Sequence, residues 1–215
     1  MNTHVSSRRF YSGLFALDTI LIVVSAVWGF AFLKEMIAIR PDFWNIDRDW
    51  SAGEILNYIK WLILAFVFLT AFLRDRAVMM LSLFLVVLIL LADDSLQLHE
   101  TLGPNVVQAI GLQHTLGEKA YTIGSMVIWG GLGVVVLAIT MFGWRSASSS
   151  LRKQLYPVFA YFFAIIFCAI GIDAIHELFD FPKVIKGVLG ILEDGGEMLF
   201  LTAMTRHVWI KFRAT

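Results

Sequence analysis

The feature that most constrains this chain is a series of six apolar stretches, each long enough to cross a bilayer as one helix. Spanning the hydrocarbon core takes about 20 consecutive, mostly apolar residues. Composition agrees, since 59% of the residues are hydrophobic and the mean hydropathy is +0.77, unlike a soluble domain. We therefore expect an all-α integral membrane bundle of six transmembrane helices. The predicted spans are 11–33, 56–73, 78–98, 121–143, 155–178 and 187–205.

Basic residues predict the orientation, because cytoplasmic loops are enriched in Lys and Arg. The richer set of loops and ends carries Arg8, Arg9, Arg74, Arg76, Arg145, Arg152, Lys153, Arg206, Lys211 and Arg213. The opposite set carries Lys34, Arg40, Arg48, Lys119, Lys183 and Lys186. Both termini are therefore expected in the cytoplasm, with the first apolar stretch retained as a membrane helix. The linkers are short, which favours a single domain over residues 1–215.

The charge balance and the cysteine content limit the possible binding partners and covalent links of this protein. Lys and Arg together number 17, as do Asp and Glu, so the net charge indicates no nucleic-acid partner. The single cysteine, Cys168, rules out an intramolecular disulfide. Membrane lipid is the expected surrounding, and a lipid-like substrate is the expected small-molecule partner.

Acidic residues interrupt three of the predicted spans. The third span ends in "DDSLQLHE", the fifth ends in "GIDAIHELFD", and the sixth begins "GVLGILEDGGEM". Because successive spans alternate in direction, all three acidic clusters are expected at one depth near the outer face. Within the spans Lys60 is the one basic residue, so protons, water or bound cations have to compensate these buried charges.

Helical spacing predicts which of these side chains share a face. Asp173, His176 and Glu177 lie at i, i+3 and i+4, and Glu193 and Glu197 lie at i and i+4. Asp93, Gln97 and Glu100 form a third stripe, which His99 joins only if its helix rotates or unwinds near the end. Carboxylate and imidazole ligands suit zinc or iron, and the number of oxygens suits a two-metal site. The predicted ligands are His176, Glu177, Asp173, Glu193, Glu197, Glu100 and His99, and the predicted catalytic or proton-relay residues are Asp93, Asp94 and Asp194.

Two features have a simpler alternative. Acidic residues at helix ends can be solvated at the membrane interface without binding a metal. The segment after the third span has an apolar pattern, Val106, Val107, Ile110 and Leu112, that is typical of an interfacial helix. This segment is either a plain connector or a lid over the acidic site, with His114 as an additional ligand.

The sequence matches known motifs only in part. "HETLG" and "HELFD" do not complete the H-E-x-x-H pattern of a zinc protease helix. "DDSLQLHE" followed by "LEDGGEM" resembles a pattern in uncharacterised bacterial multi-pass membrane proteins, an acidic pair before His-Glu and a later E-[DE]-x-x-E-M. The resemblance implies a bacterial inner-membrane setting and carries no activity with it.

Three functions are consistent with these residues. A metal-dependent membrane hydrolase or oxidase would use the acidic cluster to activate water or dioxygen on a lipid-like or small apolar substrate. A cation or proton transporter would use the same acids, although a transporter needs a polar route across the whole membrane and the inner halves of the third and fifth spans are nearly all apolar. A non-catalytic subunit of a membrane complex is the third. The sequence favours the enzyme.

Overall fold

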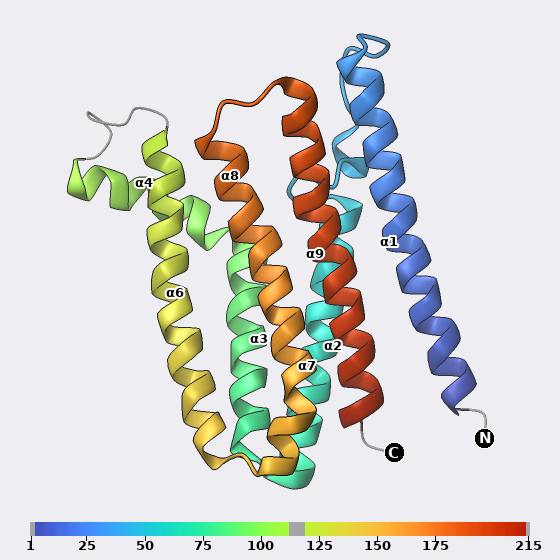
Figure 1. Cartoon of the computed structure of the whole chain (residues 1–215), viewed down its shortest axis with the longest axis vertical. Coiled ribbons are helices and arrows are strands. Elements are labelled where there is room, and N and C mark those ends of the chain that lie inside the picture. Colours follow the sequence, from blue (N-terminus) through green and yellow to red (C-terminus); the bar gives the residue numbers. More distant parts are fainter. Residues whose placement is uncertain (1–2, 112–118, 214–215) are drawn as a thin grey trace. The chain divides into compact units, whose positions relative to one another are not determined.

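The structure is a computed structural model that describes residues 3–111 and 119–213, with side chains for residues 10–111, 120–175 and 178–213. His114 and Leu112 lie outside these ranges, as do the side chains of Arg8, Arg9, His176 and Glu177. The described chain is helical and contains no strand. The elements, drawn in Figure 1, are α1 (Thr3–Leu33), η1 (Asp42–Trp44), α2 (Ala52–Asp75), α3 (Val78–Leu96), α4 (Leu98–Ile110), α6 (Lys119–Ser146), α7 (Ser149–Ile166), η2 (Phe167–Ile172), α8 (Asp173–Leu178) and α9 (Lys183–Phe212).

Five described helical stretches are long and apolar enough to cross a membrane, namely Phe10–Leu33, Ala52–Asp75, Val78–Leu96, Ala120–Ser146 and Ser149–Ile175. This confirms an all-helical, multi-pass membrane protein. The sixth predicted span lies within α9, a single helix of 30 residues. α9 is long enough, but Glu193, Asp194 and Glu197 interrupt its apolar centre. The number of six spans and the cytoplasmic termini therefore remain predictions.

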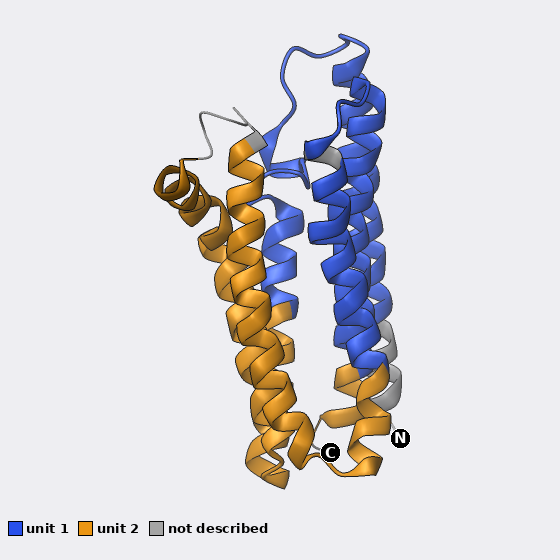
Figure 2. Ribbon diagram, turned by 60° about the vertical axis from the view of Figure 1, so that its left-hand side comes forward, with its two compact units in different colours: residues 1–60, 157–207 blue, residues 61–156, 208–215 orange. Residues whose placement is uncertain are grey.

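The helices divide into two compact units (Figure 2). Unit 1 comprises residues 1–60 and 157–207, and unit 2 comprises residues 61–156 and 208–215. α2, α7 and α9 each supply residues to both units.

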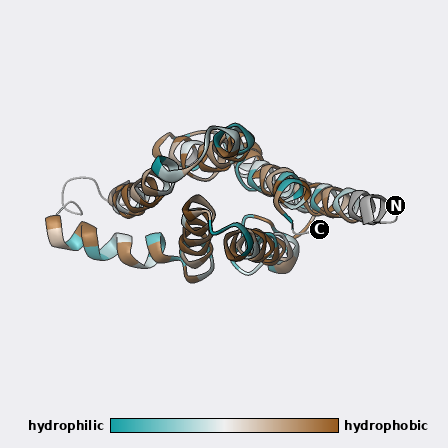
Figure 3. Ribbon diagram, turned by 90° about the horizontal axis from the view of Figure 1, so that it is seen from below, coloured by the Kyte–Doolittle hydropathy of each residue, from teal (hydrophilic) through white to brown (hydrophobic). Residues whose placement is uncertain are grey.

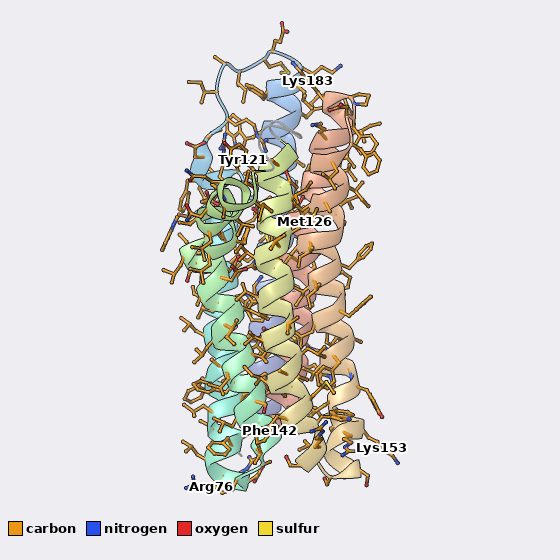
Figure 4. The ribbon with its side chains drawn as sticks, turned by 90° about the vertical axis from the view of Figure 1, so that its left-hand side faces the viewer. Arg76, Tyr121, Met126, Phe142, Lys153 and Lys183 are labelled. Carbon is orange, nitrogen blue, oxygen red and sulfur yellow. The ribbon has the colours of Figure 1, made fainter. Side chains whose placement is uncertain are left out.

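Unit 2 is built on α3, α4 and α6, and close approach at glycines holds these helices together. A Cβ added at Gly143 of α6 would lie 3.0 Å from the Met79 Cα on α3. At the other end of α6, a Cβ added at Gly124 would lie 2.8 Å from Val107 Cγ2 and press on the Gly103 carbonyl of α4. Figure 4 shows Arg76 and Lys153 at the same end of this unit as Phe142, with Tyr121 at the other. The basic residues Arg76 and Lys153 thus share one end, as the orientation argument requires.

Gly124→Ala is expected to lower the stability of unit 2 by about 1–3 kcal/mol, the usual cost of forcing extra volume into a packed contact. The added methyl group would push α4 away from α6, so hydrogen exchange of the α4 amides should accelerate. Gly130→Ala on the same helix is the matched control, because nothing lies within 4 Å of a Cβ there. That control should be neutral or stabilising by up to about 1 kcal/mol. Equal effects from the two substitutions would contradict the packing described.

The helix that begins at Val78 ends two residues before the predicted boundary. Gln97 adopts φ 51° and ψ 45°, a left-handed conformation that stops α3 and starts α4 in a new direction. The predicted stripe of Asp93, Gln97 and Glu100 assumed a continuous helix, and that assumption is wrong. The alternative stated for His99, in which the helix unwinds near its end, agrees with the break at Gln97.

α4 confirms the apolar pattern predicted for this segment, although it starts before Pro104 and includes this proline. Polar and apolar residues are mixed along it in Figure 3, whereas the long helices are mostly apolar. Val107 is buried against α6, and Ile110 is exposed. An amphipathic helix of this kind suits the membrane interface.

Unit 1 holds α1 beside α9, which run in opposite directions (Figure 1). A Cβ added at Gly195 would lie 3.2 Å from Ile22 on α1, and one at Gly196 would lie 2.7 Å from the Cys168 sulfur on η2. The two glycines of "EDGGEM" therefore admit two neighbouring helices at the same level of α9. Because acids flank both glycines, this packing draws α1 and η2 close to Glu193, Asp194 and Glu197.

Candidate functional site

A fully buried ion pair lies at the centre of unit 1. The Lys60 ammonium on α2 is 2.7 Å from Asp18 Oδ1 on α1, and both side chains have zero exposed surface. The Thr202 hydroxyl on α9 donates to Asp18 Oδ2 at 2.6 Å. Lys60 also donates to the Met198 carbonyl at 3.2 Å and to Asn57 Oδ1 at 3.0 Å. All three hydrogens of the ammonium thus have acceptors, as a buried charge requires.

Asn57 connects this pair to the predicted acidic site. Its Oδ1 accepts from Lys60, and its amide nitrogen donates to Glu197 Oε1 at 3.5 Å. The polar chain therefore runs from Asp18 through Lys60 and Asn57 to Glu197. Lys60 is the one basic residue within the predicted spans, but the sequence does not indicate its partner. Asp18 and Lys60 lie 42 residues apart on different helices, and no spacing rule predicts their pairing.

Carboxylates from three segments of unit 1 lie around Asp194. This residue interacts electrostatically with Glu193, Asp47, Glu197 and Asp173. Of these, Glu193, Glu197 and Asp173 were predicted to meet Asp194, and unit 1 does bring them together. Asp47 was missed, because it lies in the loop between α1 and α2, outside the predicted spans. Its Oδ2 forms an ion pair with Arg40 Nη1 at 3.7 Å.

Asp173 begins α8, and positions 173, 176 and 177 fall in one α-helical turn. The backbone spacing predicted for Asp173, His176 and Glu177 is therefore present. The side chains of His176 and Glu177 lie outside the described residues, so their role as metal ligands stays a prediction. Among the side chains that the structure describes, no three of His, Cys, Asp or Glu converge to hold a metal ion.

A second polar centre lies in unit 2, at the junction of α3 and α4. Asp93 is buried, and its Oδ1 accepts from the His99 backbone N–H at 3.2 Å. Its Oδ2 lies 3.2 Å from His99 Nδ1 and accepts from the Trp129 indole N–H, also at 3.2 Å. The His99 ring packs against the Trp129 ring, with centroids 4.4 Å apart. Asp93 thus binds the residue after the helix break, and sequence reasoning missed Trp129 as its partner.

The electrostatics of this centre favour a protonated imidazole. Burial works to lower the pKa of His99, but its hydrogen bond with Asp93 and its interaction with Glu100 outweigh burial and raise this pKa to about 9. The ion pair with His99 in turn lowers the pKa of Glu100, whose Oε1 lies 3.7 Å from Nε2. Near neutral pH both ring nitrogens of His99 then carry hydrogens.

The predicted site residues thus belong to two different units. Unit 2 holds Asp93, Asp94, His99 and Glu100, where Asp94 is half-buried on α3. Unit 1 holds Asp173, Glu193, Asp194 and Glu197, together with positions 176 and 177. The prediction that one chamber unites both groups stays a prediction.

Comparison with known proteins gives one family match. A family model described as "Domain of unknown function (DUF8692)" matches residues 50–208. Comparison with curated proteins and with solved structures gives no match. The matched segment includes all the predicted site residues, whereas Asp18 and Asp47 precede it.

Proposed function

Because this chain belongs to the DUF8692 family, whose description states no activity, we propose its function from the site itself: a multi-pass membrane protein that translocates protons or cations through unit 1. The supporting observation is the hydrogen-bonded chain from Glu197 through Asn57 and Lys60 to Asp18. Ionisable residues inside membrane segments are costly, and they usually line ion pathways or proton relays.

The hydrogen-bonded chain from Glu197 to Asp18 favours translocation, which the apolar spans alone did not. The apolar inner halves of the third and fifth spans favoured an enzyme, because a transporter needs a polar route. In unit 1 the polar groups lie instead on α1, α2 and α9. Thr202 and Thr205 extend them toward the C-terminal end of α9, and both are fully buried. A route along these helices therefore includes four buried polar groups, Asp18, Lys60, Thr202 and Thr205.

The carboxylates around Asp194 would form the entrance to that route. Four acids lie within electrostatic reach of Asp194, while Lys60 is bound to Asp18. Such a group attracts protons and cations from solution, since like charges held close together favour uptake of positive charge. Transfer would then pass between Glu197 and the Asp18–Lys60 pair, with Asn57 positioned between them.

Flux measurement in proteoliposomes tests the proposal. Purified full-length protein, reconstituted with a pH-sensitive dye inside, should dissipate a proton gradient faster than empty liposomes. Glu197→Gln keeps the shape of the side chain but removes its charge, so flux should fall to the level of empty liposomes. Asp180→Asn, an exposed acid between α8 and α9, is the matched control and should leave flux unchanged. Wild-type liposomes that pass neither protons nor monovalent or divalent cations would exclude translocation.

A metal-dependent membrane enzyme is the second candidate. It is favoured by the helical turn that carries Asp173 together with positions 176 and 177, next to the acids of α9. Zinc or iron, as one ion or two, would activate water or dioxygen there. Metal analysis of the purified protein separates the two candidates. Stoichiometric metal that is lost in a His176→Ala, Glu193→Ala variant supports the enzyme, and protein without bound metal excludes it.

A further inference from the structure

A cavity of about 480 Å³ lies in unit 1, between the C-terminal half of α1 and the first two turns of α9. Sites for small molecules typically measure about 300–1,000 Å³ and have mostly apolar walls. Gly29 on α1, with Gly187 and Gly190 on α9, leave space where side chains would otherwise fill it. The apolar lining includes Ala26, Phe30, Leu33, Val184, Val188 and Ile191.

The rim of this cavity is cationic. Arg40, Lys183 and Lys186 line it, against Asp47 as the one acid in its lining. Lys183 is exposed at the start of α9, and Figure 4 shows it at the end of the helix. An apolar chamber with such a rim matches a molecule that has an apolar body and an anionic head.

Arg40 is held in position at this rim. Its guanidinium lies against α1 at Gly29, 3.5 Å from where a Cβ would be. It donates to Asn45 Oδ1 and, at 3.4 Å, to Ser25 Oγ. Its Nε is buried and has no acceptor among the residues that the structure describes. A buried N–H without an acceptor is costly, and an anionic oxygen would satisfy it.

From these observations we infer that the cavity binds a membrane phospholipid with an anionic headgroup, its phosphate on Arg40, Lys183 and Lys186 and an acyl chain between α1 and α9. α1 ends at Leu33 and α9 begins at Lys183, so the rim lies at headgroup depth on whichever side of the membrane this end faces. Arginine and lysine near a membrane end are suited to anionic lipid headgroups. The inference goes beyond the proposed function, because it uses none of the polar chain from Glu197 to Asp18.

Native mass spectrometry of the detergent-purified full-length protein tests this inference. Phosphatidylglycerol should be retained in preference to phosphatidylcholine with the same acyl chains. Arg40→Gln should weaken phosphatidylglycerol retention about fivefold or more, and Lys153→Gln, an exposed lysine of unit 2, should not. Gly187→Leu should weaken retention of both lipids, because its side chain would occupy the space beside Leu33, 3.9 Å from a Cβ there.

The other possible results of the lipid-retention experiment also support or overturn the inference. If Arg40→Gln lowers the melting temperature, the double variant Lys183→Gln with Lys186→Gln is tested in its place. Both lysines lie in the first turn of α9, where a substitution disturbs folding less. Equal retention of the two lipids would overturn the inference, as would an unchanged affinity in the lysine variant. Inorganic phosphate that binds alone and displaces the lipid would assign the rim to a free anion instead. Flux through unit 1 is expected to persist in Gly187→Leu, so failure here and failure of translocation are separable.

Discussion

Lys60→Met is expected to lower the free energy of unfolding by about 3–5 kcal/mol, the usual effect of removing one partner of a buried ion pair. The substitution leaves the Asp18 carboxylate without its cation in a site with no exposed surface. Loss of the hydrogen bonds alone would be smaller, because interhelical hydrogen bonds in membrane proteins average about 0.6 kcal/mol. Unfolding by a denaturing detergent, followed by circular dichroism, measures the difference.

The double substitution Asp18→Leu with Lys60→Met is the control for this prediction. Replacing both members of a buried pair by apolar residues is often neutral, so most of the lost stability should return. This variant should still lack proton or cation flux, because the relay has lost two titratable groups. A single Lys60→Met protein as stable as wild type would contradict the buried pair. A double variant that transports normally would contradict the proposed route.

Asp93→Asn is expected to bring the pKa of His99 from about 9 down toward its ordinary value of 6.5. Asparagine keeps the size of the side chain but removes the charge that holds the proton on Nδ1. NMR titration of labelled histidine in the detergent-solubilised protein measures the pKa directly. Glu100→Gln should lower it less, because Glu100 is exposed and its contact with His99 is longer, 3.7 Å against 3.2 Å. A wild-type His99 that titrates near 6.5 would contradict this arrangement.

The same ion pair makes the α3–α4 junction sensitive to pH. The pKa of His99 is higher in the folded state than in the unfolded chain, so folding favours the protonated form. The stabilisation is therefore fully present below about 6.5 and is lost as the pH rises through about 9. Hydrogen exchange at the start of α4 should become faster than elsewhere in unit 2 over that range. Asp93→Asn should remove this dependence.

The length and hydropathy of its apolar stretches predicted most helices of the chain. The boundaries of α2 and α6 lie within a few residues of the expected spans, because length and hydropathy are local properties that a bilayer constrains strongly. The fifth expected span, by contrast, is divided among α7, η2 and α8. Grouping of the acids on α9 with Asp173 was also predictable, since helical spacing and alternating direction place them at one level. The existence of an amphipathic helix before Gly111 was expected for the same local reason.

What the sequence did not predict depends on contacts between distant segments. Gln97 adopts a left-handed backbone, although glycine or asparagine usually marks such positions. The hydrogen bonds of Asp93 with the His99 ring and backbone N–H stabilise the chain after this residue. Asp93 is in turn bound by Trp129 of α6, a contact between distant segments. Asp18 and Lys60 likewise lie on different helices, and nothing near either residue indicates the other. In the sequence Trp129 is one more apolar residue of a predicted span. Only the structure shows that its indole N–H donates to Asp93.

The π-helix η2 has a consequence for Asp173, which directly follows it. A π-helical turn holds about one residue more than an α-helical turn, and each residue of an α-helix turns the chain by about 100°. Asp173 therefore points in a different direction from the one it would have at the end of an uninterrupted α7. The direction of the Asp173 side chain therefore depends on the number of residues in η2. In family members, insertions or deletions within residues 167–172 would redirect the acid without altering it.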